Sequence, residues 1–169
     1  LLAQITRHRL ASFSVQSQRY VSVAGQEVFD YVCPPRIRGL GPEAQEKYLA
    51  QMKTMQRWYD EWTEALGEDA AEDARFVLPG AAATRMTVTM NARELLHFFS
   101  LRMCNRAQWE IRELAWQMYA LVAPLAPAVF ADAGPGCVRG ACPEGKRSCG
   151  RADEVRARRA ACQERREKE

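Results

Sequence analysis

The stretch TRMTVTMNARELLHFFSLRM, residues 84–103, decides the fold because its hydrophobic period changes halfway along. From Thr84 to Met90 apolar and polar side chains alternate, which is typical of a strand with one buried face. From Ala92 to Met103 the apolar residues instead follow helical spacing. The stretch therefore predicts a strand that passes directly into a helix, and the polar residues at the junction can gather at one end of that element.

Two longer helical patterns flank this stretch. The first predicted helix runs from about Glu43 to Leu66, with Pro42 in its first turn and Gly67 just after its end, where each residue is favoured. Its stripe consists of Tyr48, Met52, Met55, Tyr59, Trp62 and Leu66. The second helix has the stripe Ile111, Leu114, Ala115, Met118, Val122 and Leu125, and Pro124 and Pro127 end it. A further short strand is predicted at residues 20–23, so the class is mixed α and β, with too few strands to close a sheet unaided.

Composition indicates one ordinary globular domain. The chain has 169 residues, of which 47% are hydrophobic and 27% charged. A net charge of +3 is too small to predict nucleic acid as a partner. The sequence contains no apolar run long enough for a transmembrane helix, and residues 1–10 do not resemble a signal peptide.

The chain changes character at about residue 132. Beyond it, glycines and prolines alternate with cysteines, and a charge-rich stretch follows from Arg151 to Glu169. The residues from Arg139 onward carry a net charge of +4, so the positive charge of the chain belongs to this extension. The six cysteines, without a secretion signal, favour reduced thiols in the cytoplasm. Cys137, Cys142, Cys149 and Cys162 could bind a metal, although they lack the paired C-x2-C spacing of reliable zinc sites.

Arginines among hydroxyl and amide side chains form the first candidate site. They lie between Gln4 and Tyr20, a segment that includes Arg7, Arg9 and Arg19. Guanidinium groups bind phosphate and carboxylate oxygens bidentately, so this segment is either an anion-binding loop or an ordinary solvated loop. Phosphate-loop, nucleophile-elbow and H-E-x-x-H motifs are absent from the sequence.

A second polar group surrounds the strand and helix of residues 84–103. It consists of Arg75, Asn91, Arg93, His97 and Arg102. His97 is either a satisfied core histidine or a ligand-binding residue. Arg102 lies among leucines and phenylalanines, so its guanidinium must be paired or must face a ligand.

These residues together resemble the flavin-dependent thymidylate synthases, the ThyX family. Arg7-His8-Arg9, followed by seven residues and Ser17, resembles the RHR-x7-S signature of that family. Three further blocks, at residues 75–79, 89–95 and 107–112, resemble the family's remaining blocks in the same order. The resemblance covers residues 1–132, with residues 133–169 as a cysteine-containing, basic C-terminal extension.

The resemblance implies an α+β fold in which an antiparallel sheet is flanked by helices. It also implies a homotetramer whose active sites lie between subunits. Members of the family carry a further N-terminal stretch ahead of the equivalent of Leu1, so we expect the N-terminal part of the fold to be missing from this chain. Neither nucleic acid nor a membrane is expected as a partner.

The implied reaction is the reductive methylation of dUMP to dTMP. Methylenetetrahydrofolate supplies the carbon, and NADPH supplies reducing equivalents through bound FAD. The chemistry needs no cysteine nucleophile, so we expect Cys104 to be a small buried hydrophobe. No metal is expected at the active site.

The resemblance also assigns roles to residues. Arg102 matches the position credited with polarising the uracil, and it also binds dUMP. The other residues matching dUMP-binding positions are Gln4, Arg7, Val15, Gln16, Ser17, Gln18, Arg19 and Arg75. Those matching FAD-binding positions are Arg7, His8, Arg9, Asn91, Arg93 and His97.

Two departures from the family pattern stand out. Val15 offers no polar side chain, so any contact there must come from the main chain, and His97 stands where some relatives have Asn. Neither change removes an arginine, and we expect activity of the full-length protein to survive both. The alternative function is a non-catalytic nucleotide- or metal-binding module.

Overall fold

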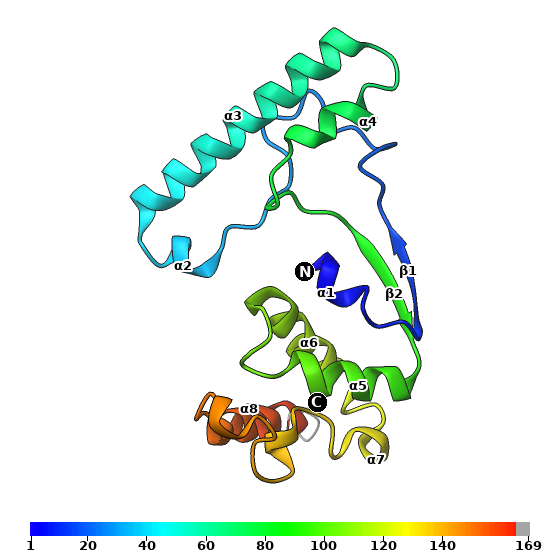
Figure 1. The fold of residues 1–169 in the computed structure, drawn as a ribbon, viewed down its shortest axis with the longest axis vertical. Helices are drawn as coiled ribbons and strands as arrows, with labels where there is room; N and C mark the ends of the chain where they lie inside the picture. The colour runs from blue at the N-terminus through cyan, green and yellow to red at the C-terminus, as the bar shows by residue number, and fades with distance from the viewer. Residues whose placement is uncertain (165–169) are drawn as a thin grey trace. The chain divides into compact units, whose positions relative to one another are not determined.

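The computed structural model describes residues 1–164 and divides into two compact units. The terminal unit comprises Leu1–Phe13 and the described residues from Val88 onward, and the central unit comprises Ser14–Thr87. The predicted α and β class is confirmed. Helices dominate both units, and the described sheet has two strands, β1 (Ala11–Val15) and β2 (Met86–Met90) (Figure 1).

The sheet is antiparallel. Just beyond the paired strands, the Gln16 amide donates to the Arg85 carbonyl, and the Thr84 hydroxyl donates to the Gln16 carbonyl. The residue after β1 thus lies beside the residue before β2. In β2 the methionines and Val88 are half-buried while both threonines are exposed, so the predicted alternation is confirmed.

The strand predicted at residues 20–23 is wrong, because this segment forms turns. The Ser17 hydroxyl accepts a hydrogen bond from the Arg19 amide, and the Ser17 carbonyl accepts one from the Val21 amide. Local hydroxyl bonds of this kind compete with strand pairing. The first strand instead lies upstream, at β1.

In the central unit, the predicted long helix is confirmed as α3 (Pro42–Leu66). Gly67 ends it with φ 73°, a left-handed conformation that glycine adopts without a Cβ clash. Met52, Gln56 and Tyr59 are buried, whereas Trp62 and Leu66 remain about half exposed, so only part of the predicted stripe reaches the core. The short helices α2 (Pro35–Arg38) and α4 (Ala71–Ala74) and the 3-10 turn η1 (Arg75–Val77) complete this unit.

The terminal unit contains α1 (Leu2–Ile5), α5 (Ala92–Arg102), α6 (Trp109–Val122), α7 (Pro127–Phe130) and α8 (Ala152–Glu164) (Figure 1). Two 3-10 turns, η2 (Gly136–Val138) and η3 (Gly145–Arg147), lie between α7 and α8. The helices predicted at residues 92–103 and 111–125 are confirmed as α5 and α6, which pack on each other. Their shared core consists of Phe98, Phe99, Met103, Ile111, Ala115, Trp116 and Tyr119.

The segment beyond residue 132 packs within the terminal unit. Val155 of α8 is buried, and Arg158 stacks its guanidinium over the Trp116 ring of α6 at 4.7 Å. Residues 165–169 of the predicted basic extension lie outside the described residues. No described helix is long and apolar enough to cross a membrane.

Candidate functional site: a carboxylate, a histidine and an arginine in series

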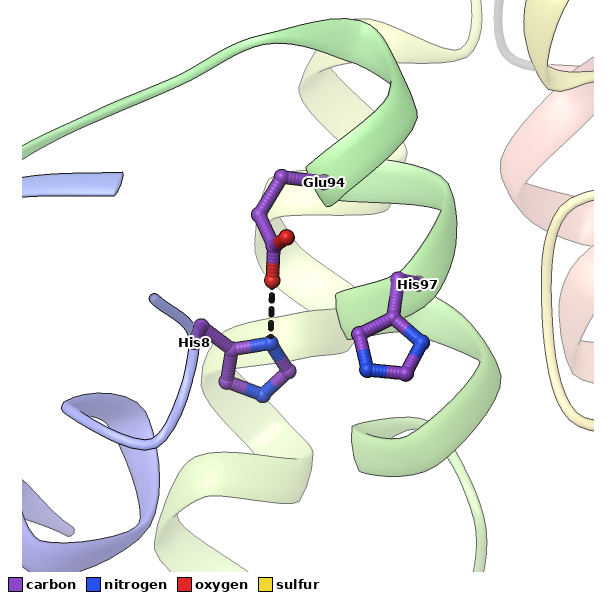
Figure 2. Close-up of side chains that lie close together, drawn as sticks. All are labelled: His8, Glu94 and His97. Atoms are coloured by element: carbon purple, nitrogen blue, oxygen red, sulfur yellow. Dashed lines mark hydrogen bonds and ion pairs between the residues drawn. The ribbon is translucent and has the colours of Figure 1, made fainter. Parts of the chain in front are cut away.

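A buried chain of three polar side chains lies in the terminal unit. His8 follows α1, and its Nδ1 lies 2.8 Å from Oε1 of Glu94, in the first turn of α5 (Figure 2). Arg102, at the other end of α5, donates from Nε to Nε2 of His8 at 3.2 Å. Both His8 and Glu94 are buried. The carboxylate therefore positions the imidazole, and the imidazole positions the guanidinium.

The hydrogen bonds fix the protonation state of His8. Because Arg102 donates to Nε2, this nitrogen carries a lone pair, and the proton is on Nδ1, facing Glu94. Burial lowers the pKa of His8 from its ordinary value of 6.5, and this effect outweighs the hydrogen bond to Glu94, which raises it. The charge of Arg102 lowers it further. Within this chain, His8 is a neutral connector between an anion and a cation.

Arg102 is held at one edge only. Its Nη2 donates to the Gln4 carbonyl at 3.0 Å, while its Nη1 makes no hydrogen bond within the described residues. Burial, and then the charge of Arg7, lower the pKa of Arg102. The expectation that this guanidinium is paired is confirmed, and the planar group also keeps one free edge in a fixed orientation. Gln4 Oε1 is itself buried without a hydrogen-bond partner within the described residues.

Glu94 was not among the predicted site residues. The sequence placed it in the same block as Asn91 and Arg93, but helical spacing alone did not show that its carboxylate turns inward to His8. The pairing joins residues 86 positions apart, so only the tertiary structure reveals it.

His97 lies beside His8, with ring centroids 5.5 Å apart, but its side chain is exposed (Figure 2). The interpretation as a core histidine is therefore wrong. The ligand atoms of His8, Glu94 and His97 lie within 4.8 Å of one another, close enough for a metal ion. However, both His8 nitrogens are already used by Glu94 and Arg102, and a neighbouring guanidinium repels a cation. The cluster is better suited to an anionic or polar ligand.

Three exposed guanidinium groups of the terminal unit, those of Arg7, Arg9 and Arg93, make no hydrogen bond or ion pair to any described residue. Arg7 and Arg9 flank His8 in the chain, and Arg93 lies in the first turn of α5. Asn91 caps that helix by accepting from the Glu94 amide at 2.9 Å, which leaves only its Nδ2 to donate elsewhere. A helix N-terminus with unpaired arginines favours negative charge.

The structure divides the predicted site residues between the two units. The terminal unit holds Gln4, Arg7, His8, Arg9, Asn91, Arg93, His97 and Arg102. The central unit holds Val15, Gln16, Ser17, Gln18, Arg19 and Arg75. All six predicted flavin-binding residues thus belong to one compact unit.

In the central unit, two predicted arginines share one acidic residue. Arg19 Nε donates to the Glu72 carboxylate at 2.8 Å, and Arg75 Nε donates to the Glu72 carbonyl at 3.0 Å. Arg19 and Glu72 are both about half exposed, so this ion pair is weak and can exchange for another anion. The structure thereby brings together two arginines that lie 56 positions apart in the sequence.

The loop after β1 also lines a pocket of about 240 Å³ in the central unit. Gln16, Ser17 and Gln18 form one side of it, and Thr84 and Arg85 lie opposite. The main-chain groups of Gln16 are used in pairing with residues 84 and 85, so polar contacts from this loop must come from side chains or later amides. Arg85 was not predicted as a site residue, because its place in the alternating pattern indicated only an exposed strand position.

Comparison with known proteins identifies the class to which these features belong. The family described as thymidylate synthase complementing protein matches residues 1–128. The chain belongs to this family.

Individual relatives carry a more particular name. The flavin-dependent thymidylate synthase of Geobacter sulfurreducens is 52% identical over 155 residues, which are 90% of this chain and 64% of the relative. Proteins of the same name from Clostridium tetani and Nitratidesulfovibrio vulgaris are 42% and 49% identical, covering 92% and 89% of this chain. The chain spans 67% and 63% of the length of these two relatives.

The lowered pKa of His8 predicts how stability depends on pH. Between that lowered pKa and 6.5, the unfolded chain binds a proton that the folded protein does not, so the free energy of unfolding falls as the pH falls through this window. Protonation would also set two N–H donors, on His8 and Arg102, against each other. Urea denaturation between pH 4.5 and 8 measures the slope. We expect His8→Gln to flatten it, and His97→Gln, which leaves the buried chain intact, to keep it. An unchanged slope in His8→Gln would contradict the assignment.

Proposed function

We propose that the full-length protein is a flavin-dependent thymidylate synthase that methylates dUMP reductively to dTMP. Methylenetetrahydrofolate would be the carbon donor, NADPH the reductant and FAD the bound cofactor, in a protein of the ThyX fold. The observation that carries the proposal is the series Glu94, His8 and Arg102, which ends in a guanidinium with one free edge. The names of the relatives and the family membership support the same reaction.

The residues of the terminal unit fit FAD. Arg7, Arg9 and Arg93 offer guanidinium groups without a protein partner, as a pyrophosphate requires. Asn91 Nδ2 and the exposed His97 ring can donate or accept at the edge of an isoalloxazine. Bound FAD would supply the redox chemistry that these side chains lack.

The nucleotide would be held by residues from both units. We assign Arg102 and Gln4, with its unpartnered Oε1, to the pyrimidine. We assign Ser17, Gln18, Arg19 and Arg75 to the sugar and phosphate, with Arg19 exchanging Glu72 for the ligand. The fixed positive charge of Arg102 would stabilise the anionic pyrimidine ring whose C5 attacks the one-carbon unit.

We assign the enzyme to the cytoplasm as a homotetramer. Exposed tryptophans support the assembly: Trp58 and Trp62, one helical turn apart on α3, are 49% and 53% exposed. Large aromatic side chains on one helix face are typical of a protein interface. The alternative, a non-catalytic nucleotide- or metal-binding module, is not favoured, because the matched relatives are named as enzymes.

Flavin binding tests the proposal directly. We expect the purified full-length protein to show flavin absorbance, to form dTMP from dUMP, and to oxidise NADPH slowly until dUMP is added. Arg93→Ala should weaken FAD binding by about 10- to 100-fold, because a hydrogen bond to a charged group contributes about 1.5–3 kcal/mol. The exposed Arg36, in the central unit, provides the control variant Arg36→Ala, which should bind FAD normally. A folded full-length protein that lacks flavin and cannot be reconstituted with FAD would refute the function.

A further inference from the structure

Four of the six cysteines line one small pocket of the terminal unit. Cys104 follows the end of α5, Cys137 lies in η2, and Cys142 and Cys149 lie on either side of η3. Cys104 is thus neither helical nor fully buried, in contrast to the prediction. Burial raises the pKa of Cys137, and the neighbouring sulfurs of Cys142, Cys104 and Cys149 raise it further, as expected of thiols that face a common space.

The set differs from the one suggested by sequence order. That set combined the three extension cysteines with Cys162, whereas the pocket combines them with Cys104 from the segment between α5 and α6. A ligand bound there would therefore connect the extension to the helices that carry Glu94 and Arg102.

The pocket has room for a single ion. Its volume of about 20 Å³ is close to that needed for one water molecule. No three of its sulfurs lie within 4.8 Å of one another in this structure, compared with about 3.8 Å between sulfurs of a tetrahedral zinc site with Zn–S bonds of about 2.3 Å. Ligand binding thus requires the loop to contract slightly, which is reasonable for a segment with two short 3-10 turns as its only regular structure.

The loop is held so that its cysteines converge. A Cβ on Gly136 would lie 2.8 Å from Pro143 Cγ, so the two turns next to Cys137 and Cys142 are in direct contact. Arg156 of α8 donates to the Cys137 and Gly140 carbonyls, both at 3.0 Å. Arg106, two residues after Cys104, donates to the Glu144 carboxylate at 2.9 Å and to the Arg147 carbonyl at 3.2 Å. These bonds orient the turns without using a sulfur.

The surroundings also favour thiolates. Asn105 Nδ2 donates to Cys149 Sγ at 3.7 Å, and N–H donors from the Arg151 backbone and from Asn105 lower the pKa of the Cys149 thiol. Four thiolates around a divalent cation leave a net charge of −2. Arg106, Lys146, Arg147 and Arg151 lie within three residues of a pocket cysteine and can balance that charge.

The cysteine loop lies beyond residue 128, where the family match ends. It nevertheless lies within the length shared with relatives. An alignment that covers 90% of the chain, as that with the Geobacter sulfurreducens protein does, omits about 17 residues, which is too few to exclude the segment between Cys104 and Cys149 from either end. The segment is therefore part of an enzyme-sized relative and not an unrelated addition.

We propose that Cys104, Cys137, Cys142 and Cys149 bind one Zn²⁺ ion as four thiolates, in a structural site that fastens the extension to the end of α5. Binding releases the four thiol protons and changes no oxidation state. With all four positions filled by protein ligands, the site is closed, as structural zinc sites are. The proposal does not depend on the proposed enzymatic function.

The test measures metal in the full-length protein purified without chelators, by elemental analysis and by competition with a chromophoric zinc chelator. We expect about one zinc per chain, and a zinc affinity at least about tenfold lower in Cys104→Ser, Cys137→Ser, Cys142→Ser and Cys149→Ser. Cys33→Ser and Cys162→Ser are the matched controls and should keep the wild-type zinc content. A strong chelator should lower the melting temperature of the wild type and of both controls, but not that of the four variants.

Several results would overturn the proposal. Absence of zinc together with failure to bind added Zn²⁺ is one, and loss of zinc in Cys162→Ser but not in Cys104→Ser is another. Iron and acid-labile sulfide in equal amounts would show a cluster in place of a single ion. If Cys104→Ser fails to fold, the exposed Cys149 decides the outcome, because Cys149→Ser disturbs no buried packing.

Discussion

Replacing Arg102 with alanine is expected to lower the single-turnover rate of dTMP formation by about 10²–10³-fold at saturating dUMP, which corresponds to roughly 3–4 kcal/mol. The reason is preorganisation: His8 and the Gln4 carbonyl already hold one edge of the guanidinium, so its charge is in place before the anionic ring develops. A contact that strengthens only as charge develops affects the chemical rate and not the binding of dUMP.

Two further variants separate the roles of the arginines. Arg102→Lys keeps the charge but loses the planar group that reaches His8 and Gln4 together, so we expect it to be impaired as well. Arg19→Ala removes a half-exposed arginine paired with Glu72 and should mainly raise the KM for dUMP. Each variant must first be shown to have wild-type flavin content and oligomeric state. Recovery of the wild-type rate in Arg102→Ala at high dUMP would reduce Arg102 to a binding residue.

Replacing Phe99 with alanine is expected to lower the free energy of unfolding by about 3–5 kcal/mol. Phe99 is fully buried, and its ring meets those of Phe98, Tyr119 and Phe130 edge-on, with centroids 5.5–6.0 Å apart. Truncation removes these contacts and leaves a cavity between α5, α6 and α7. Since domains are stable by only about 5–15 kcal/mol, the loss would be a large share of the total.

Urea denaturation measures this loss, with Leu101→Ala as the control on the same helix. Leu101 is 47% exposed, so its truncation should change stability far less. A difference of less than about 1 kcal/mol between the two variants would contradict the packing described for Phe99. Because α5 also carries Glu94 and Arg102, a loosened core should weaken the site as well as the fold.

Several predictions from sequence concerned regular elements and were confirmed. The helices α3, α5 and α6 and the strand β2 follow from hydrophobic periodicity and from Pro and Gly at helix ends, because these signals act between residues close in sequence. The strand predicted at residues 20–23 was wrong because side-chain hydroxyl bonds there produce turns. The roles assigned to individual site residues stay predictions.

The sequence by itself thus determined the α+β class, the main helices and, through the ordered blocks beginning at Arg7, the family. Only the tertiary structure decided which of those residues touch. It joined His8 to Glu94 and Arg102, Arg19 to Glu72, and Cys104 to the cysteines of the extension. The physical reason is distance along the chain: periodicity reports the face on which a side chain lies, whereas a contact between residues dozens of positions apart depends on how whole elements pack.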